Sequence, residues 1–279
     1  MQQVSLLGLP EFSSAASLRR RGLTSHAVQG LLREGRLIRV RRGRYARPDA
    51  RSELVRAVRL GGRLTSFSAL RAHGVWCPPG DERLHVSVDP HARALRDPDT
   101  GDPLDVGRRD VVVHWNGGEE TSDVEGVVPV ARAIRHLPGD LDVACLVAVL
   151  DSAVRERVCT SRQLAGELGS VPRLGRVMRR MDPRAESGTE SVTRVRLIDA
   201  GLEVEPQVRI PPYRVDLVLP GRLVVEVDGR EFHDTASSFE GDRRRDAELA
   251  RRGYRVLRLS YAQVLYDWPT CLAAVLAAL

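Results

Sequence analysis

The sequence predicts a multidomain chain of the α/β and α+β classes, and three observations lead to that prediction. The first part of the 279 residues reads as two helices followed by a basic hairpin. The last part alternates helix and strand patterns, and its strands carry carboxylates within aliphatic runs. Between these parts, residues 179–188 combine charge, proline and glycine in the manner of a linker. We therefore predict domains at residues 1–51, 52–183 and 184–279.

The composition is typical of a soluble globular protein in a reducing compartment. Hydrophobic residues make up 42% of the chain and charged residues 29%. Neither a secretory signal nor an apolar run of the roughly 18 residues that suggest a membrane span is recognisable. We therefore expect a cytoplasmic location and no membrane partner. The cysteines form no Cys-x-x-Cys pair and predict neither a zinc ribbon nor a disulfide framework; they are Cys77, Cys145, Cys159 and Cys271.

The basic residues are all arginines, and they are unevenly distributed. The chain contains 43 of them and no lysine, which excludes any mechanism that needs a lysine. Eleven arginines lie between Leu18 and Arg51 against only two acidic residues, a net charge of +9 compared with +6 for the whole chain. Guanidinium groups suit phosphate, so this concentration indicates a nucleic-acid-binding segment.

The first two predicted helices have recognisable ends. Ser13 or Ser14 is expected to cap a helix that ends near Gly22. Ser25 is a plausible N-cap for the second helix, and Gly35 is expected at its C-terminal end. The stretch "LIRVRRGRYARP" then alternates apolar and basic residues, which predicts a hairpin with arginines at its tip.

Two helices and a basic hairpin in this order predict a winged helix-turn-helix. One helix of such a domain enters the major groove, and the wing holds the phosphate backbone. A small helical hairpin with a solvated basic face is the alternative. The segment "LTSHAVQGLLREGRLIRVRRGRYA" resembles the N-terminal domain of abortive-infection-type (type IV toxin–antitoxin) antitoxins, which are winged-helix transcriptional regulators. That resemblance implies double-stranded DNA and a cognate toxin or defence partner. The predicted DNA contacts here are Arg33, Arg36, Arg39, Arg41, Arg42 and Arg44.

The middle domain is predicted to be a small α+β platform that connects the two ends. Strands are expected at "RLHVSVD", "DVVVHW" and "VEGVVPV", and a long helix at "DLDVACLVAVLDSAVRERV". His85, Asp89 and His91 suggest a metal site, but a strand that enters a proline turn, with His85 facing a neighbour, is favoured over it. Trp76 and Trp115 are expected in the core.

The C-terminal domain begins with a helix whose first turn carries a carboxylate. Ser187 is expected to cap it, and Glu190 occupies the third helical position, the spacing of a capping box. Glu190 is therefore either a capping residue or a member of a site, and the sequence leaves both roles open.

The following hairpin, "YRVDLVLPGRLVVEVDG", has two candidate registers. A two-residue loop would pair Leu219 with Arg222, whereas a three-residue loop would pair Leu219 with Leu223 and set Asp216 opposite Glu226. The second register is favoured because it makes one face entirely aliphatic. That face comprises Val215, Leu217, Leu219, Leu223, Val225 and Val227. The other carries Arg214, Asp216, Val218, Val224, Glu226 and Asp228.

Three neighbouring carboxylates on one face either have raised pKa values or bind a cation. All-oxygen sites of this kind suit Mg²⁺ or Mn²⁺. Asp216, Glu226 and Asp228 together predict such a site.

This arrangement resembles the active-site hairpin of the PD-(D/E)XK nuclease superfamily. Within it, the sequence looks like the uncharacterised branch related to very-short-patch-repair endonucleases. The resembling segments lie between Ser187 and Ser260 and read "SGTESVTRVRLIDAGL", "QVRI", "YRVDLVLPGRLVVEVDGREFH" and "DRRRDAELARRGYRVLRLS". The resemblance implies a restriction-endonuclease-like α/β fold with a mixed central sheet, and a metal-dependent phosphodiesterase.

The resemblance also implies roles for individual residues. Asp216 and Glu226 would be metal ligands together with the backbone carbonyl of Val227. His233 would activate water, and Glu190 would reach the site from its helix.

Asp228 departs from the family pattern, because relatives carry lysine or histidine at this position. An aspartate cannot supply positive charge, but it could ligate a second metal or orient His233.

A helix follows the site, and then a third strand and a terminal helix that covers the sheet. Arg243 and Arg245 lie near the start of the first of these helices, where they could hold DNA phosphate or steady the carboxylates. Arg258, on the third strand, is expected to point its guanidinium at the carboxylate face.

The sequence therefore predicts a Mg²⁺-dependent DNA endonuclease that its own winged helix targets to duplex DNA, in repair, restriction or phage defence. The alternative is a non-catalytic DNA-binding regulator or antitoxin with a degenerate nuclease domain. An RNA nuclease is a third reading.

Overall fold

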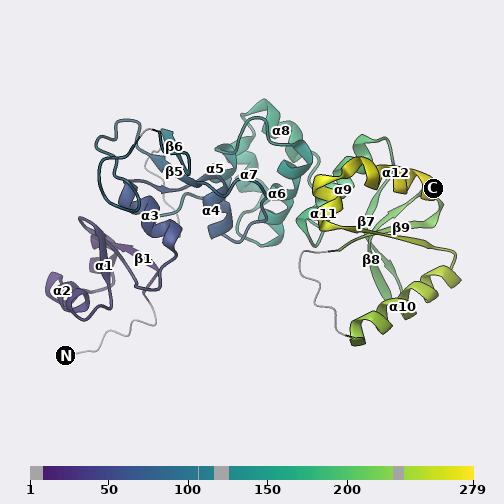
Figure 1. Ribbon diagram of the computed structural model, residues 1–279, viewed down its shortest axis with the longest axis horizontal. Helices are drawn as coiled ribbons and strands as arrows, with labels where there is room; N and C mark the ends of the chain where they lie inside the picture. The colour runs from purple at the N-terminus through teal and green to yellow at the C-terminus, as the bar shows by residue number, and fades with distance from the viewer. Residues whose placement is uncertain (1–8, 106, 116–125, 229–235) are drawn as a thin grey trace. The chain divides into compact units, whose positions relative to one another are not determined.

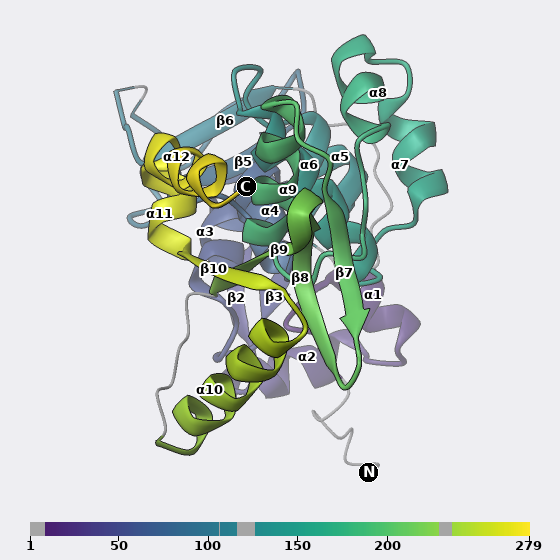
Figure 2. The same ribbon diagram turned by 90° about the vertical axis from the view of Figure 1, so that its right-hand side faces the viewer.

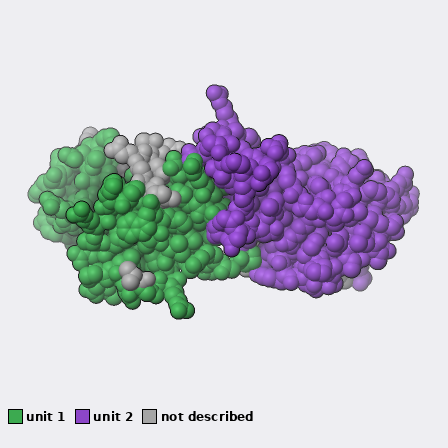
Figure 3. Space-filling model, turned by 90° about the horizontal axis from the view of Figure 1, so that it is seen from above, with its two compact units in different colours: residues 1–74, 79–137 green, residues 75–78, 138–279 purple. Residues whose placement is uncertain are grey.

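The computed structural model describes residues 9–105, 107–115, 126–228 and 236–279, with side chains of the last segment from Arg243 onward. The chain forms two compact units (Figure 3). Unit 1 comprises residues 1–74 and 79–137, and unit 2 comprises residues 75–78 and 138–279. Within the described ranges, no helix combines the length and the apolar character needed to cross a membrane.

The N-terminal part of unit 1 contains two helices and a three-stranded sheet of order β1-β3-β2 (Figure 1). Ser14 caps the first helix, as predicted, by accepting from the backbone N–H of Ser17. The second helix is capped by Thr24, which accepts from the N–H of Ala27 at 3.2 Å, so the predicted cap at Ser25 is wrong by one residue. The elements are β1 Phe12–Ser14, α1 Ala15–Arg20, α2 Ser25–Arg33, β2 Ile38–Arg41 and β3 Arg44–Ala46.

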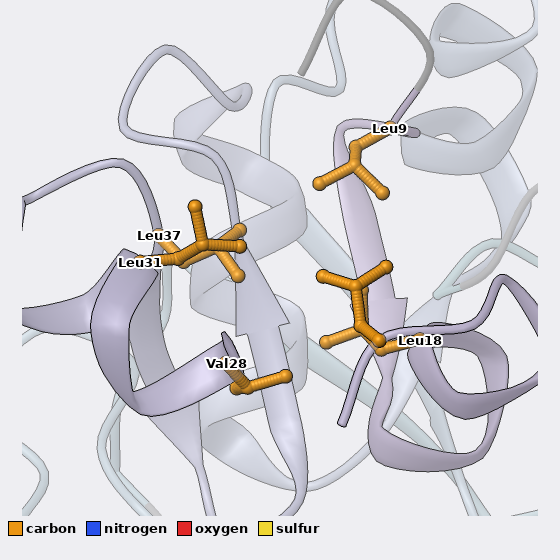
Figure 4. Close-up of a cluster of buried hydrophobic side chains, with 6 residues drawn as sticks. Leu9, Leu18, Val28, Leu31 and Leu37 are labelled. Carbon is orange, nitrogen blue, oxygen red and sulfur yellow. The ribbon is translucent and has the colours of Figure 1, made fainter. Parts of the chain in front are cut away.

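Leucine and valine side chains from both helices and their connections form the core of this part (Figure 4). They occur at helical spacing on α2, where Val28 and Leu31 turn inward and the arginines stay exposed. The cluster consists of Leu9, Leu18, Leu23, Val28, Leu31 and Leu37.

The rest of unit 1 is built around a second sheet of order β4-β5-β6, in which β5 and β6 run parallel. Within the described part of the predicted strand "VEGVVPV", from Gly126 onward, Val127 makes a β-bridge to Leu64 and a helix begins at Val130. The elements are α3 Ser52–Leu60, β4 Arg63–Leu64, α4 Ser66–Ala72, β5 Leu84–Val88, β6 Val111–Trp115 and α5 Val130–Arg135.

Two aromatic predictions in the middle of the chain have different outcomes. Trp115 is 53% exposed, so its predicted core position is wrong. It ends β6, which among the described strands lies at the edge of its sheet, next to β5. Trp76 is half-buried and lies directly over Gly188, where an added Cβ would come within 2.2 Å of the indole ring.

His85 faces neighbouring side chains from within its strand. Its Nδ1 lies 3.1 Å from Nε2 of His114, and its Nε2 lies 3.2 Å from a carboxylate oxygen of Asp81. His114 in turn stacks on His136. Burial lowers the pKa of both His114 and His136 to about 4, so these rings are neutral at pH 7.

Unit 2 begins with a helical layer in which α6 packs along α9. The apolar residues of α6 are buried over most of its length, from Ala144 to Ala153. The helices are α6 Val143–Arg155, α7 Ser161–Leu168, α8 Pro172–Met178 and α9 Gly188–Asp199.

The C-terminal sheet has the order β10-β9-β8-β7, with β7, β8 and β9 antiparallel and β10 parallel to β9. α10 lies on one face, and α9, α11 and α12 lie on the other (Figures 1 and 2). The single predicted terminal helix is in fact two helices that meet at Asp267. The elements are β7 Glu205–Ile210, β8 Tyr213–Leu219, β9 Leu223–Asp228, α10 Ala236–Arg251, β10 Arg255–Ser260, α11 Tyr261–Tyr266 and α12 Trp268–Ala278.

A buried ion pair joins α6 to α9. Asp151 is fully buried, and it accepts from Nη2 of Arg194 at 3.1 Å and from the hydroxyl of Ser191 at 2.9 Å. Its other oxygen accepts from the backbone N–H of Asp182 at 2.7 Å. Burial raises the pKa of Asp151, while Arg194 and these hydrogen bonds act to lower it.

Removing this carboxylate is expected to destabilise unit 2 strongly. Asp151→Ala leaves Arg194 buried without its counter-charge, and we expect a loss of about 3–5 kcal/mol in the free energy of unfolding measured in urea. Asp199→Ala, which breaks the more exposed pair with Arg180, is the control, with an expected loss below about 1 kcal/mol. Equal losses in the two variants would contradict the role given to the buried pair.

Candidate active site

The register of the β8–β9 hairpin determines which carboxylates of the candidate site face each other. Leu219 pairs with Leu223 across the turn Pro220–Arg222, which confirms the predicted three-residue connection. Gly221 supplies the left-handed conformation of this turn, with φ at 68°. Since Leu217 pairs with Val225, Asp216 lies opposite Glu226 on the neighbouring strand.

The two faces of the hairpin are covered differently. The six aliphatic residues predicted for one face are all buried. On the other face, Val224 belongs to a hydrophobic cluster that includes Leu249 of α10. α10 therefore covers the face that carries the carboxylates, where Glu226 is buried and Asp216 is half-buried.

Asp216 and Glu226 form a tightly coupled pair. Their side chains lie on the same face of neighbouring strands and shift each other's pKa, and the Oδ2 of Asp216 accepts from the backbone N–H of Val227 at 2.9 Å. Burial and the neighbouring charge of Asp216 raise the pKa of Glu226 to about 8. Burial also raises the pKa of Asp216. The pair therefore holds either a shared proton or an additional cation at neutral pH.

Arg245 of α10 supplies a positive charge to this pair. Its Nη2 donates to Oε1 of Glu226 at 2.5 Å and to the backbone carbonyl of Arg214 at 2.7 Å. Its guanidinium also lies 6.0 Å from the centre of the Tyr213 ring. Of the two roles left open for Arg245, the structure shows the contact with a carboxylate. This contact lowers the pKa of Glu226 and only partly offsets burial and repulsion.

Glu190 approaches the pair from the first turn of α9. Ser187 caps the helix by accepting from the N–H of Glu190 at 3.1 Å, as predicted. The Glu190 carboxylate accepts from the N–H of Glu186 at 2.8 Å and from the side-chain amide of Gln207 at 2.7 Å. Burial and the charge of Asp216 raise the pKa of Glu190. Glu190 thus supports its own helix and also belongs to the electrostatic surroundings of Asp216.

Gln207 is a site residue for which we made no individual prediction. On β7 it lies between Pro206 and Val208, whose partners on β8 are Leu217 and Val215, so Gln207 faces the Asp216 position. Its backbone is left-handed, with φ at 58°, a strain of about 1–3 kcal/mol for a residue other than glycine. Its side chain joins the Glu190 carboxylate to the guanidinium of Arg214. Gln207 could have been found from its register with β8. That register can be read only once β7 is known to belong to the sheet.

Of the remaining predicted catalytic residues, Asp228 has a position in the sheet and His233 falls outside the described residues. Asp228 is the half-buried last residue of β9 and pairs in register with Ser260. Over the described residues, no group of three or more His, Cys, Asp or Glu side chains is arranged to hold a metal ion. The structure thus brings Asp216 and Glu226 together, with Glu190 nearby, rather than the predicted triplet of carboxylates.

The arginines predicted to contact DNA or carboxylates lie in two regions, the C-terminal domain and the N-terminal part of unit 1. Arg243 is exposed near the start of the described part of α10. Arg258 pairs in register with Glu226, and its guanidinium binds both oxygens of Asp246, at 2.6 and 2.7 Å. The six arginines of α2 and the β2–β3 region are all exposed: Arg33, Arg36, Arg39, Arg41, Arg42 and Arg44.

Comparison with known proteins defines the class of the C-terminal domain. A protein-family model described as REase_MTES_1575, a restriction endonuclease-like family, matches residues 190–279. The match covers β8, β9 and Glu190, and it supports a nuclease-like domain in this part of the chain. A search of curated proteins finds no significant match.

One solved structure is similar over a longer part of the chain. The crystal structure of the RV2827C protein from Mycobacterium tuberculosis shares 18% sequence identity, covers 66% of this chain and 76% of its own, and gives a TM-score of 0.30. A TM-score this low supports no conclusion about fold or function.

The pKa of Glu226 predicts how stability depends on pH in the absence of metal. The folded state holds a proton that the unfolded state releases near pH 4.5, so stability falls as pH rises towards the folded pKa of about 8. In EDTA, we expect the melting temperature to decline between pH 5 and about 9. Glu226→Gln should flatten this decline, and an unchanged slope in that variant would contradict the raised pKa.

Proposed function

We propose that the chain is a metal-dependent endonuclease that hydrolyses phosphodiester bonds in duplex DNA. The observation that carries this proposal is the pair of facing carboxylates, buried Glu226 and half-buried Asp216, on adjacent strands of a restriction endonuclease-like domain. Facing carboxylates with little exposure to water are unfavourable unless a proton or cation compensates them. Such a pair is therefore more readily explained by a site than by stability.

The donor set fits a divalent cation. Asp216 and Glu226 offer oxygen atoms, the ligands that Mg²⁺ and Mn²⁺ prefer, and both have raised pKa values with a single guanidinium close by. These two side chains and the backbone carbonyl of Val227 would hold the ion. A bound cation would polarise a phosphoryl oxygen and favour ionisation of a water molecule.

The chain's own residues have distinct tasks in this proposal. Arg245 fixes the position of the Glu226 carboxylate and supplies positive charge to the site from α10. Glu190, held by Gln207 and the start of α9, orients water beside Asp216. His233 accepts a proton from the attacking water, and Asp228 orients His233.

Unit 1 would target the nuclease to DNA. Its first part has the element order expected of a winged helix-turn-helix, with α2 as the recognition helix and β2–β3 as the wing. The exposed arginines of these elements would contact phosphates. The proposed domains remain residues 1–51 for DNA binding, 52–183 for the connection and 184–279 for the nuclease.

One observation favours a second candidate function, a DNA-binding regulator without catalysis. Arg245 already occupies Oε1 of Glu226, and Asp228 stands where relatives carry a base or a cation. A cation would have to compete with this guanidinium. The resemblance to antitoxin regulators then points to a cognate toxin or defence partner.

Plasmid nicking separates the two functions. We expect the purified chain to nick supercoiled plasmid with Mg²⁺ or Mn²⁺ and not in EDTA, and Asp216→Asn and Glu226→Gln to reduce nicking by about 100-fold or more. Asp199→Asn is the matched control, because it removes a carboxylate at the C-terminal end of α9, from the more exposed ion pair with Arg180. Tight duplex binding without cleavage by any metal-loaded form would favour the regulator.

The wing makes a separate prediction. Replacing Arg41, Arg42 and Arg44 by glutamine should weaken duplex binding and reduce the slope of log K against log salt by about 2–3, because up to three phosphate contacts are lost. Fluorescence anisotropy with a labelled duplex, at several salt concentrations, measures both quantities. Unchanged affinity and slope would show that DNA does not bind at the wing.

A further inference from the structure

Unit 1 contains a cavity of about 460 Å³ between the β2–β3 hairpin and the second sheet. This volume lies within the range of about 300–1,000 Å³ that is typical of ligand pockets. Four of its lining residues are arginines, three from the hairpin and one from β4. They are Arg41, Arg42, Arg44 and Arg63.

These arginines bring concentrated positive charge to the cavity. In the described part of the chain, Arg41, Arg42 and Arg44 form no ion pair or hydrogen bond through their side chains. The one acidic residue of the lining, Asp89, is exposed and accepts from the backbone N–H of His91 at 2.7 Å. Like charges converging on a concave surface attract an anion, and guanidinium groups pair with phosphate in a bidentate manner.

The backbone beside the cavity is shaped to accept one of these guanidinium groups. Gly61 has a φ of 120°, and a Cβ at this position would lie 2.2 Å from Nη1 of Arg41. The missing side chain at Gly61 thus leaves the space that the guanidinium fills. At the next residue, a Cβ on Gly62 would lie 2.3 Å from the backbone oxygen of Ser87, another residue of the lining. The glycines thus leave room for the guanidinium of Arg41 and for the approach of Ser87.

The cavity also has an apolar floor. Phe12, Val58, Val88 and Val128 line it, and each is at most 5% exposed. An isolated phosphate ion would satisfy the arginines and leave this floor uncovered. A ligand that combines phosphate with a flat apolar group, as a nucleotide does, would cover both parts.

We propose that this cavity binds a small phosphorylated ligand of the nucleotide class, with its phosphates on the arginines and its base against the apolar floor. The proposal does not depend on catalysis in the C-terminal domain. Because Arg41, Arg42 and Arg44 are also the proposed wing contacts, the ligand would compete with duplex DNA. The DNA backbone is the other source of phosphate that the arginines could recognise, so the experiment includes both sources.

The test uses the full chain in EDTA, with ATP, inorganic pyrophosphate and adenosine as probes in isothermal titration calorimetry. We expect ATP to bind saturably at one site, and adenosine to bind at least about 10-fold more weakly because it lacks phosphate. Arg42→Gln with Arg44→Gln should weaken ATP binding by about 10-fold or more. Arg33→Gln with Arg36→Gln removes the same charge from exposed positions outside the cavity and should leave ATP binding within about 2-fold.

Binding of a labelled DNA duplex is measured in a second set of experiments. Both double variants should bind it more weakly, and ATP should displace it from the wild-type chain. The proposal is overturned if ATP shows no saturable binding or if adenosine binds as tightly as ATP. It is equally overturned if the cavity variant, Arg42→Gln with Arg44→Gln, binds ATP with the wild-type affinity. It is also overturned if the cavity variant loses DNA affinity while ATP neither binds nor competes. Should the double variant lose its cooperative melting, the exposed single change Arg42→Gln replaces it.

Discussion

The pairing of Leu219 with Leu223 is the constraint on which the candidate site depends. A connection one residue shorter would place Asp216 and Glu226 on opposite faces, and no pair would form. The aliphatic residues of the hairpin enforce this register because burying them requires all of them on one face. Packing on one face of the sheet thus determines the chemistry available on the other.

The sequence predicts those parts of the site that follow from local periodicity. The register of the hairpin and the Ser187 cap are confirmed, because alternation and cap spacing are readable within a few residues. Arg245 contacts Glu226, and Gln207 contacts Glu190. Both contacts depend on how separate elements pack, so they could not be predicted from the sequence. The wrong prediction for Trp115 has the same origin, since apolar character does not reveal which strand lies at a sheet edge.

The absence of lysine is balanced by arginines with very different environments. Arg194 is buried against Asp151, and Arg245 is held by Glu226. Arg42 and Arg44 remain exposed beside a cavity. One residue type therefore stabilises the helical layer, moderates the carboxylate pair and provides a surface suited to phosphate, according to what surrounds it.

If the proposed metal site exists, the contact between Arg245 and Glu226 also affects its affinity for a cation. Because the guanidinium is tethered on α10, its effective concentration at Oε1 of Glu226 is fixed by the fold and does not change with dilution. It acts as an intramolecular competitor, and the apparent dissociation constant of a cation is inversely proportional to the fraction of molecules in which the guanidinium has left Glu226. A nucleic acid whose phosphates draw Arg245 away from Glu226 would thereby strengthen metal binding, so that substrate and cation load together.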